Sequence, residues 1–451
     1  MKTLQKVCLA AMLISFVALS LVMYLSNLHY VFYNSDGSIS LQAREVAQQI
    51  AFTKYLNKYS KQIIDWNTYI KRQGIFISNK RLIDDHNFNN KDFKLDYNEF
   101  SDLTNDEYVS QKLGFQKNVS LKFTDVNGTR LAKIQKQMRL GEDYYLNWQK
   151  QQQSENQTVS ATTNKSATIS NITGVLNVNS TSKVPTSTSV TIASSINTNI
   201  TNSVTTSTGS LGLKELVKPA ANLTGSELKL PVNLDWRFSN IVTTVKDQGS
   251  CGSCYAFSAL ANVESLLLQR SQSKYKSVDL SEQQIVDCTA RGYGNSGCRG
   301  GDMMNVFEYL RTWESMTEGS YPYIGKDQRC KFDLNTGVTL VEDYYFFQTY
   351  NPDDIKEFVA RFPVTVGLDA SSSYFRFYSS GIITTTKCGT GLNHAVLIIG
   401  YGNEGGIDYW LIKNQYGIKW GERGFAKIMR SADQGICGLN QYVVIPIMPT
   451  L

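Results

Sequence analysis

The segment from residue 248 to residue 258 constrains the fold of this chain more than any other. It reads Gln-Gly-Ser-Cys-Gly-Ser-Cys-Tyr-Ala-Phe-Ser, a glycine-containing loop that runs directly into an apolar helical pattern. Cys254 therefore falls at or next to the N-terminus of a helix, where unpaired N–H groups and the helix dipole favour the thiolate. Gln248 lies six residues upstream and can return as an amide donor. The segment predicts a reactive thiol on a helix suited to the centre of a domain.

Histidine can activate a thiol and later protonate a leaving amine. The chain contains His29, His86 and His394. Only His394 lies beyond residue 230, where it opens an apolar strand pattern 140 residues after Cys254. Asn414 can accept a hydrogen bond from that imidazole and fix its orientation. An oxyanion needs donors, for which we predict the side chain of Gln248 and the backbone N–H of Cys254.

The motif around Cys254 resembles the active-site segment of papain-like cysteine proteases, in which the histidine follows ~130–150 residues downstream. An upstream stretch resembles the pro-regions of cathepsin L-like proteases. The first part of the resemblance is a set of residues spaced 4, 3, 4 and 4 apart, which would lie on one face of a helix: Arg72, Phe76, Asn79, Ile83 and Asn87. The second part is the motif over residues 98–104. Polar groups within that stripe predict a polar network against a partner element. The sequence departs from the family motifs at Thr68, Asp96, Tyr255, Gln415 and Tyr416.

The resemblance implies an α+β, papain-like fold of two subdomains, a helical L lobe and a β-barrel-like R lobe, preceded by a helical pro-domain. Strand patterns over 363–367, 395–399, 409–413 and 424–428 agree with a β-rich second half. Seven cysteines follow residue 250, so six can pair and one stays free. The resemblance implies the pairs Cys251–Cys298, Cys288–Cys330 and Cys388–Cys437, with Cys254 free, although the sequence alone allows other pairings.

The resemblance also implies a substrate-binding surface. Its residues would be Gly300, Gly301, Asp302, Met303, Gly367, Leu392, Asn393, Tyr416, Trp420 and Tyr442. Glycines at 300 and 301 would let an extended peptide approach and form main-chain hydrogen bonds. Tyr416 stands where the family has a tryptophan that shields the Asn–His hydrogen bond, and it covers less area. The mixed lining favours a bulky apolar or aromatic residue two positions before the scissile bond.

We expect four segments along the chain. They are a signal peptide or membrane anchor over 1–33, a helical inhibitory pro-region over 45–116, a glycosylated low-complexity spacer over 117–229 and a papain-like catalytic domain over 230–451. The pro-region reads as helical from about 45 to 87, and residues 129–153 can form a charged helix. Residues 154–210 are rich in Ser, Thr, Asn and Val and cannot bury enough surface to order themselves. A Thr/Val-rich β module is the alternative for that stretch.

The N-terminus predicts entry into the secretory pathway. Lys2 and Lys6 precede an apolar run over residues 7–25, which fits a cleaved signal peptide or an uncleaved anchor, since a span takes ~20 residues. We expect a lysosomal, vacuolar or extracellular protein, with a type II membrane precursor if the leader is kept. An oxidising lumen also favours disulfides. Glycosylation triplets occur at Asn118, Asn127, Asn156, Asn164, Asn171, Asn179, Asn199 and Asn222.

These residues together favour a cysteine endopeptidase, made as a zymogen, that cleaves peptide bonds through a thiolate–imidazolium pair and an acyl-enzyme. Its partners would be protein or peptide substrates and its own pro-region, and we expect a monomer. Acidification would weaken the pro-region by protonating carboxylates such as Asp102. Two alternatives remain, a dipeptidyl-peptidase-type exopeptidase, favoured by Tyr255, and a catalytically silent papain-fold binding protein.

Composition argues against two other classes of protein. The net charge is +6, but residues 230–451 hold 20 Lys and Arg against 22 Asp and Glu. No basic face therefore points to nucleic acid as a partner. A single histidine and paired cysteines leave few soft ligands in that region, so we expect no metal and no cofactor.

Overall fold

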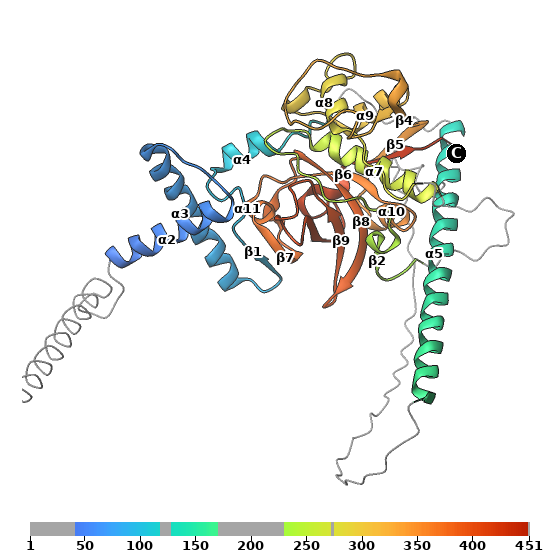
Figure 1. Ribbon diagram of the computed structural model, residues 1–451, viewed down its shortest axis with the longest axis horizontal. Coiled ribbons are helices and arrows are strands. Elements are labelled where there is room, and N and C mark those ends of the chain that lie inside the picture. The colour runs from blue at the N-terminus through green and yellow to red at the C-terminus, as the bar shows by residue number, and fades with distance from the viewer. Residues whose placement is uncertain (1–40, 118–127, 170–229, 272–274, 450–451) are drawn as a thin grey trace, which may run out of the picture.

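The computed structural model describes residues 41–117, 128–169, 230–271 and 275–449 (Figure 1). Its helices are α2 (Leu41–Lys58), α3 (Trp66–Asn89), α4 (Asn105–Lys112), α5 (Gly128–Ile169), α7 (Cys254–Arg270), α8 (Glu282–Cys288), α9 (Met303–Leu310), α10 (Pro352–Val359) and α11 (Ser373–Arg376). Its strands are β1 (Phe93–Leu95), β2 (Leu234–Asp235), β3 (Ser315–Met316), β4 (Gly337–Thr339), β5 (Asp343–Phe347), β6 (Val364–Leu368), β7 (Tyr378–Ile383), β8 (His394–Glu404), β9 (Ile407–Lys413), β10 (Phe425–Met429) and β11 (Val443–Ile447). Short 3₁₀ helices occur at Trp236–Ser239, Gly297–Arg299, Leu334–Thr336, Thr386–Cys388 and Ile436–Gln441.

The N-terminal helices form a hairpin rather than one helix. We expected helix from about 45 to 87, which is wrong between Lys58 and Trp66. The chain turns at Ser60, whose φ of 52° lies in the left-handed region. A new helix then starts at Asp65, whose carboxylate caps the backbone N–H of Thr68. The turn lets the two helices bury a shared cluster of Phe52, Tyr55, Phe76 and Ile77.

The polar stripe predicted along α3 makes the polar network that we expected. Arg72 donates to the Glu107 carboxylate at 2.5 Å and to the Asp102 carbonyl at 3.0 Å. Asn79 donates to the carbonyl oxygens of Ser101 and Leu103. Further along the helix, Asn87 bonds both the N–H and the C=O of Leu95. These bonds hold residues 95–107 against α3, so this prediction is confirmed.

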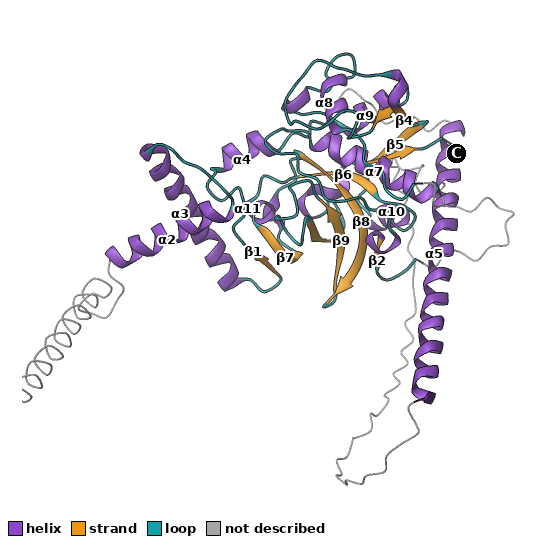
Figure 2. Ribbon diagram, viewed as in Figure 1, coloured by secondary structure: helices purple, strands orange, loops and turns teal. Residues whose placement is uncertain are grey.

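Helix α7 forms the centre of the C-terminal part. Its side chains are buried on nearly every face, as its apolar sequence predicts. The helix packs against α8 and α9 on one side and against β6 and β8 of the main sheet on the other. In Figure 2 the strands gather in the middle of the molecule, with α8 and α9 above them. The predicted mixed α+β fold with a helical pro-region is confirmed.

The main sheet has the strand order β1-β7-β10-β9-β8-β6-β11-β5, with β2 paired to β8. The four predicted strands correspond to β6, β8, β9 and β10, whereas β1, β2, β5, β7 and β11 of the same sheet were not predicted. Within the described residues β5 and β7 do not pair, so the β-barrel-like lobe that we expected is an open sheet. The pro-region extends this sheet, because β1 pairs antiparallel with β7.

Helix α5 corrects the prediction of a spacer over 117–229. It runs from Gly128 to Ile169, well past the charged helix expected over 129–153 and into the low-complexity stretch. Its first turns bury Ile134, Met138 and Tyr145 in the same apolar cluster as α7 and the main sheet. Figure 1 shows α5 standing along one side of the molecule, with its far end projecting beyond it.

In the part of the chain that the structure describes, none of the helices is both long enough and apolar enough to cross a membrane. The apolar run over residues 7–25 lies outside that part.

Candidate active site

Cys254 is the first residue of α7, where the sequence places it. The preceding loop is fixed by the Cys251–Cys298 disulfide and by a bond of 2.8 Å from the N–H of Gly252 to the carbonyl of Cys298. The Cys254 side chain is fully buried. Burial raises its pKa to about 11, against the opposing effect of nearby backbone groups of Ala395 and Gly114. In this covered state the thiol stays protonated, unlike the accessible thiolate expected from the helix N-terminus alone.

His394 begins β8, next to Ala395, whose backbone lies against the Cys254 sulfur. Its Nε2 lies 2.8 Å from Oδ1 of Asn414, as the predicted pairing requires. Its Nδ1 has no hydrogen-bond partner among the described residues. Burial lowers the pKa of His394 to about 4, against the opposing effect of the Asn414 bond. The imidazole is therefore neutral in this state.

The two residues after Asn414 complete the environment of the histidine. The Tyr416 ring is buried and its centroid lies 4.9 Å from that of His394, so this aromatic shields the imidazole. Trp420 packs in turn against Tyr416 and Phe375. Gln415 was noted only as a departure from the family, yet its Nε2 lies 3.3 Å from Nε2 of His394 and donates to the Ala395 carbonyl. Sequence reasoning gave no role to this amide.

Gln248 is buried beside Cys251 and points its amide toward a pro-region carbonyl. Nε2 donates to the carbonyl oxygen of Lys112 at 2.9 Å and to that of Cys251 at 2.7 Å. The backbone N–H of Gln248 donates to the carbonyl of Gln415. A carbonyl oxygen of the pro-region therefore already occupies this amide donor.

Residues 114–116 cover Cys254 as an extended segment. The N–H of Gly301 donates to the Gly114 carbonyl at 2.8 Å, and the N–H of Gln116 donates to the Gly301 carbonyl at 2.9 Å. On the other side, the N–H of Phe115 donates to the Asn393 carbonyl at 2.9 Å. Gly300, the residue before Gly301, has a φ of 118°, a backbone conformation that favours glycine. The pro-region therefore adds main-chain hydrogen bonds like those of an added strand.

Phe115 fills the place predicted for a substrate side chain. Its ring packs edge-on against Tyr442 at 5.0 Å between centroids. A Cβ on Gly367 would come within 2.9 Å of the Phe115 ring, so the missing side chain makes room for it.

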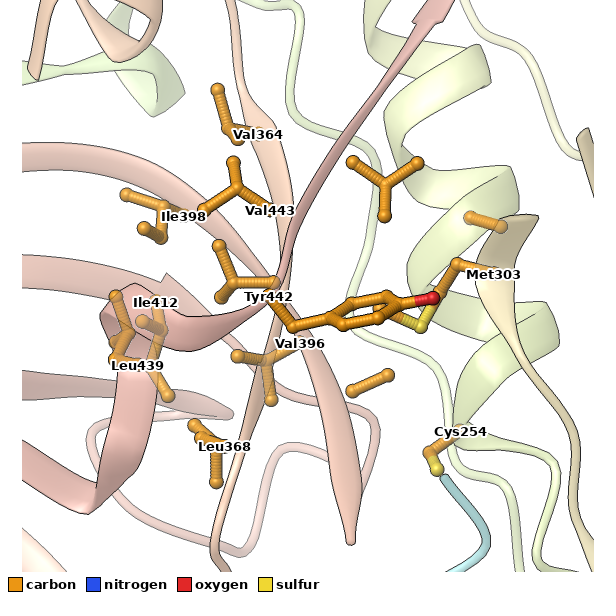
Figure 3. Packing of buried hydrophobic residues seen from close by; sticks show 14 of the residues in the cluster. Cys254, Met303, Val364, Leu368, Val396, Ile398, Ile412, Leu439, Tyr442 and Val443 are labelled. Atoms are coloured by element: carbon orange, nitrogen blue, oxygen red, sulfur yellow. The ribbon is translucent and has the colours of Figure 1, made fainter. Parts of the chain in front are cut away.

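The Tyr442 hydroxyl donates to the buried Asp302 carboxylate at 2.5 Å. Figure 3 shows Tyr442 reaching from the sheet toward Met303, with Cys254 at the end of the neighbouring helix. Leu392 lies beside Gly438.

Arg376 and Lys112 help to hold the pro-region in place, and neither was identified from the sequence. The buried Arg376 donates to the carbonyl oxygens of Phe100 and Leu103, and its own carbonyl accepts from Asn98. The ammonium of Lys112 lies 5.4 Å from the centre of the Tyr416 ring and 3.6 Å from the Asp247 carboxylate. Most of these contacts are made to main-chain carbonyl groups. Every residue has such a group, so these contacts cannot be predicted from residue types.

The three disulfides join the pairs that the family resemblance implies, Cys251–Cys298, Cys288–Cys330 and Cys388–Cys437, and Cys254 is free. Of the glycosylation triplets, Asn156 and Asn164 lie in the final turns of α5, and the other six lie outside the described residues. Across the described ranges, no group of three or more His, Cys, Asp or Glu side chains is arranged to hold a metal ion.

Comparison with known proteins agrees with this arrangement. Residues 230–447 match the papain family of cysteine proteases, and residues 52–108 match the cathepsin propeptide inhibitor domain. The cathepsin L-like proteinase of Fasciola hepatica is 40% identical over 221 residues, which cover 49% of this chain and 66% of that protein. Digestive cysteine proteinase 3 of Homarus americanus is 40% identical over 225 residues, 49% of this chain and 68% of that protein.

Among solved structures, the proform of the ragweed pollen cysteine protease Amb a 11 is similar with a TM-score of 0.61 and 28% identity, over 90% of this chain and 96% of that chain. The chain belongs to the papain family of cysteine proteases and carries a cathepsin-type propeptide inhibitor domain. The match to the Fasciola protein spans slightly less than two thirds of that protein's length.

Proposed function

We propose that this protein is a cysteine endopeptidase made as an inactive precursor. The observation that carries the proposal is the pro-region main chain beside Cys254, with the Lys112 carbonyl bound by the Gln248 amide. A carbonyl held there by such a donor occupies the place that a substrate oxyanion would take. The precursor thus holds a peptide where a substrate would lie, and the same geometry accounts for both inhibition and catalysis.

The chemistry follows from the groups around Cys254. Once the pro-region leaves, Nδ1 of His394 is available to take the thiol proton, while Nε2 stays bonded to Asn414. The sulfur attacks the peptide carbonyl carbon, and the negative charge on oxygen is stabilised by the amide of Gln248 and the N–H of Cys254. The imidazolium then protonates the leaving amine as the C–N bond breaks. Water, deprotonated by His394, hydrolyses the acyl-enzyme and restores the thiol.

Asn414 and Tyr416 act as positioning residues in this scheme. The Asn414 oxygen fixes which imidazole nitrogen faces the sulfur. Tyr416 covers the imidazole with its ring, and Trp420 supports that ring from behind. These side chains hold the histidine in one orientation through both proton transfers.

Substrate selection is proposed to rest on the place that Phe115 occupies. Tyr442, Gly367 and the Asp302–Tyr442 bond surround an aromatic side chain there. We propose a preference for bulky apolar or aromatic residues two positions before the scissile bond. A peptide-library cleavage profile tests it, and a preference for acidic residues at that position would refute it.

The continuous pro-segment favours an endopeptidase over an exopeptidase. Main chain runs past Cys254 in an extended form, with residues on both sides of Gly114 in contact with the protein. An enzyme that cleaves only near chain ends would need part of its structure to close the binding groove on one side of Cys254. Cleavage of an internally quenched peptide with both ends capped tests the endopeptidase, and cleavage only of free-ended dipeptide reporters would favour the exopeptidase.

The segments keep their proposed roles, with a catalytic domain over 230–451, an inhibitory pro-region over 45–116 and a leader over 1–33. We propose entry into the secretory pathway, glycosylation within 118–222 and residence in a lysosome, a vacuole or outside the cell. The three disulfides support an oxidising compartment.

Self-processing tests the central proposal. The purified precursor, brought to acid pH, should yield a product that begins near residue 230, while Cys254→Ala should yield none. Processing that persists in Cys254→Ala would point to another protease. A thiol-directed active-site probe separates an enzyme from a silent binding protein, because only a working Cys254 is labelled after the pro-region is removed.

A further inference from the structure

Helix α5 docks on the catalytic region through one face. Its buried residues Ile134, Met138 and Tyr145, with the half-buried Leu131 and Trp148, form a stripe on that face. Tyr145 and Trp148 pack their rings around the fully buried Trp236, at 5.9 and 6.2 Å between centroids. The stripe ends at Trp148, after which the helix sequence is polar. The first five to six turns are therefore the docked part.

Polar contacts also join this face of α5 to the catalytic region along its length. Arg130 makes a two-point contact with the Asp343 carboxylate, at 2.8 and 3.1 Å. Burial would raise the pKa of Asp343, but the hydrogen bonds from Arg130 and from the backbone of Tyr344 more than offset this and lower it. Further along, the Tyr144 hydroxyl donates to the Ser239 carbonyl at 3.0 Å. The surface thus has charge complementarity as well as apolar burial.

Gln137 makes the most demanding of these contacts. Its buried amide donates to the Pro446 carbonyl at 2.7 Å, and its oxygen accepts from the N–H of Met448 at 3.0 Å and from Arg270 at 2.7 Å. If α5 left, the Pro446 carbonyl, the Met448 N–H and the Arg270 guanidinium would each lose a hydrogen-bond partner. The free-energy cost of that loss disfavours release of the helix.

The docking surface lies far from the active site. Helix α7 carries Cys254 at its first residue and Arg270, which contacts α5, at its last. Seventeen residues at a rise of 1.5 Å put these ends about 24–26 Å apart. Figure 1 shows α2 and α3 on the opposite side of the molecule from α5. Uncovering Cys254 requires residues 112–116 to leave, but it does not require α5 to leave.

We propose that the docked part of α5, residues 128–150, stays bound to the catalytic domain after the inhibitory segment has been removed, as a second, non-covalent chain of the mature protein. The proposal rests on the proposed processing, since cuts within 118–127 and 170–229 would separate α5 from both neighbours. It also assigns a role to the insertion, because a fragment cut beyond residue 169 would extend past the docked part and would keep Asn156 and Asn164, with any glycan on them, on the mature protein. Residues 230–451 contain no such triplet of their own.

The test uses the full-length Cys254→Ala precursor, so that its outcome does not depend on protease activity. Limited trypsin treatment can cut the connecting segments, which include Lys122 and Lys229. Gel filtration under native conditions, followed by mass spectrometry, should find a peptide spanning 128–150 together with the catalytic chain. The two should separate in denaturant. A catalytic chain that elutes without the peptide would overturn the proposal, whereas failure of Cys254-dependent self-processing would sink only the proposed function.

Matched variants on one helix sharpen the test. Met138→Asp places a charge on the docked face, and Leu140→Asp places the same charge at a site that is 40% exposed. We expect the co-eluting peptide to fall at least tenfold with Met138→Asp and to stay unchanged with Leu140→Asp. If Met138→Asp does not fold, Arg130→Met adds no charge to the helix but removes the partner of the buried Asp343 carboxylate, and partial release is expected. Equal retention in Arg130→Met and Leu140→Asp would count against the docking surface.

Discussion

Gly114 of the pro-region approaches Gly252 so closely that a Cβ on Gly114 would lie 1.8 Å from the Gly252 carbonyl oxygen. The contact is between two main chains, so it cannot be relieved by rotating a side chain. Gly252 is in turn fixed by its bond to the Cys298 carbonyl and lies next to a disulfide. The inhibitory segment can therefore pass Cys254 only where the pro-region carries a glycine.

The first prediction concerns this close approach. Gly114→Ala should weaken inhibition by about 5- to 150-fold, because overpacking of this kind costs about 1–3 kcal/mol. Gly74→Ala is the matched control, since its added Cβ meets no atom within 4 Å in the same pro-region. Residual activity of each precursor, measured with a fluorogenic peptide before processing, checks the difference. Equal inhibition by the two variants would contradict the tight passage of the segment beside Gly252.

A second prediction concerns Gln248. Gln248→Ala should lower kcat of the processed enzyme by roughly 10²–10³-fold, as the loss of one oxyanion donor does elsewhere. It should also weaken binding of the pro-region, since the same amide holds the Lys112 carbonyl. Gln441→Ala serves as the control, because that exposed amide binds the Thr390 carbonyl away from Cys254. Steady-state kinetics with one peptide substrate would reveal an unchanged kcat if Gln248 had no part in catalysis.

A third prediction follows from the covered thiol. Burial raises the pKa of Cys254 to about 11 and lowers that of His394 to about 4, so the pair is neutral at pH 7 in the precursor. Alkylation by iodoacetamide should therefore be more than about 100-fold slower than for an exposed cysteine. Processing, which removes the cover, should restore fast labelling. In Cys254→Ser, residues 230–451 should take up none, because the other six cysteines of that region are paired.

A fourth prediction concerns acid release. Burial would raise the pKa of Glu107, but hydrogen bonds from the Thr104 backbone and from Arg72 outweigh it and lower the pKa to about 2, below the ordinary 4.5. A depressed pKa in the folded state stabilises the pro-region above pH 4.5, and that stability is lost as the pH falls toward 2. Glu107→Gln should lower the melting temperature at pH 7 by roughly 2–4 °C and flatten its dependence over this window. Asp106→Asn, at the exposed neighbouring position, is the control and should leave the dependence of melting temperature on pH unchanged. If Asp106→Asn flattened that dependence as much as Glu107→Gln, the effect could not be assigned to Glu107.

Much of the site could be predicted because few residue types can perform its chemistry. The pairing of His394 with Asn414 was predicted from their residue types and from the family resemblance, and the structure places them at the ends of the paired strands β8 and β9. The polar stripe on α3 was also readable, since Arg72 and Asn79 interrupt an otherwise apolar face. Disulfide pairing came from the family resemblance, because spacing alone leaves several pairings open.

Other features left no such signal. The turn at Ser60 contains no glycine or proline to mark it, so α2 and α3 read as one helix. The docked face of α5 is visible as Ile134, Met138 and Tyr145, but polar residues dilute it, and its partner Trp236 is about a hundred residues away in sequence. Main-chain contacts, such as those of residues 112–116, do not depend on residue type and cannot be read from a sequence.

Strand β1 of the pro-region occupies the edge of the main sheet by pairing with β7, whose other side is bonded to β10. When the pro-region departs, the N–H and C=O groups of β7 that faced β1 are left to water along a free edge. Free strand edges are templates on which a second molecule can add a strand. The activated form should thus self-associate more readily than the precursor, which makes the precursor the better form for keeping this protein in solution at high concentration.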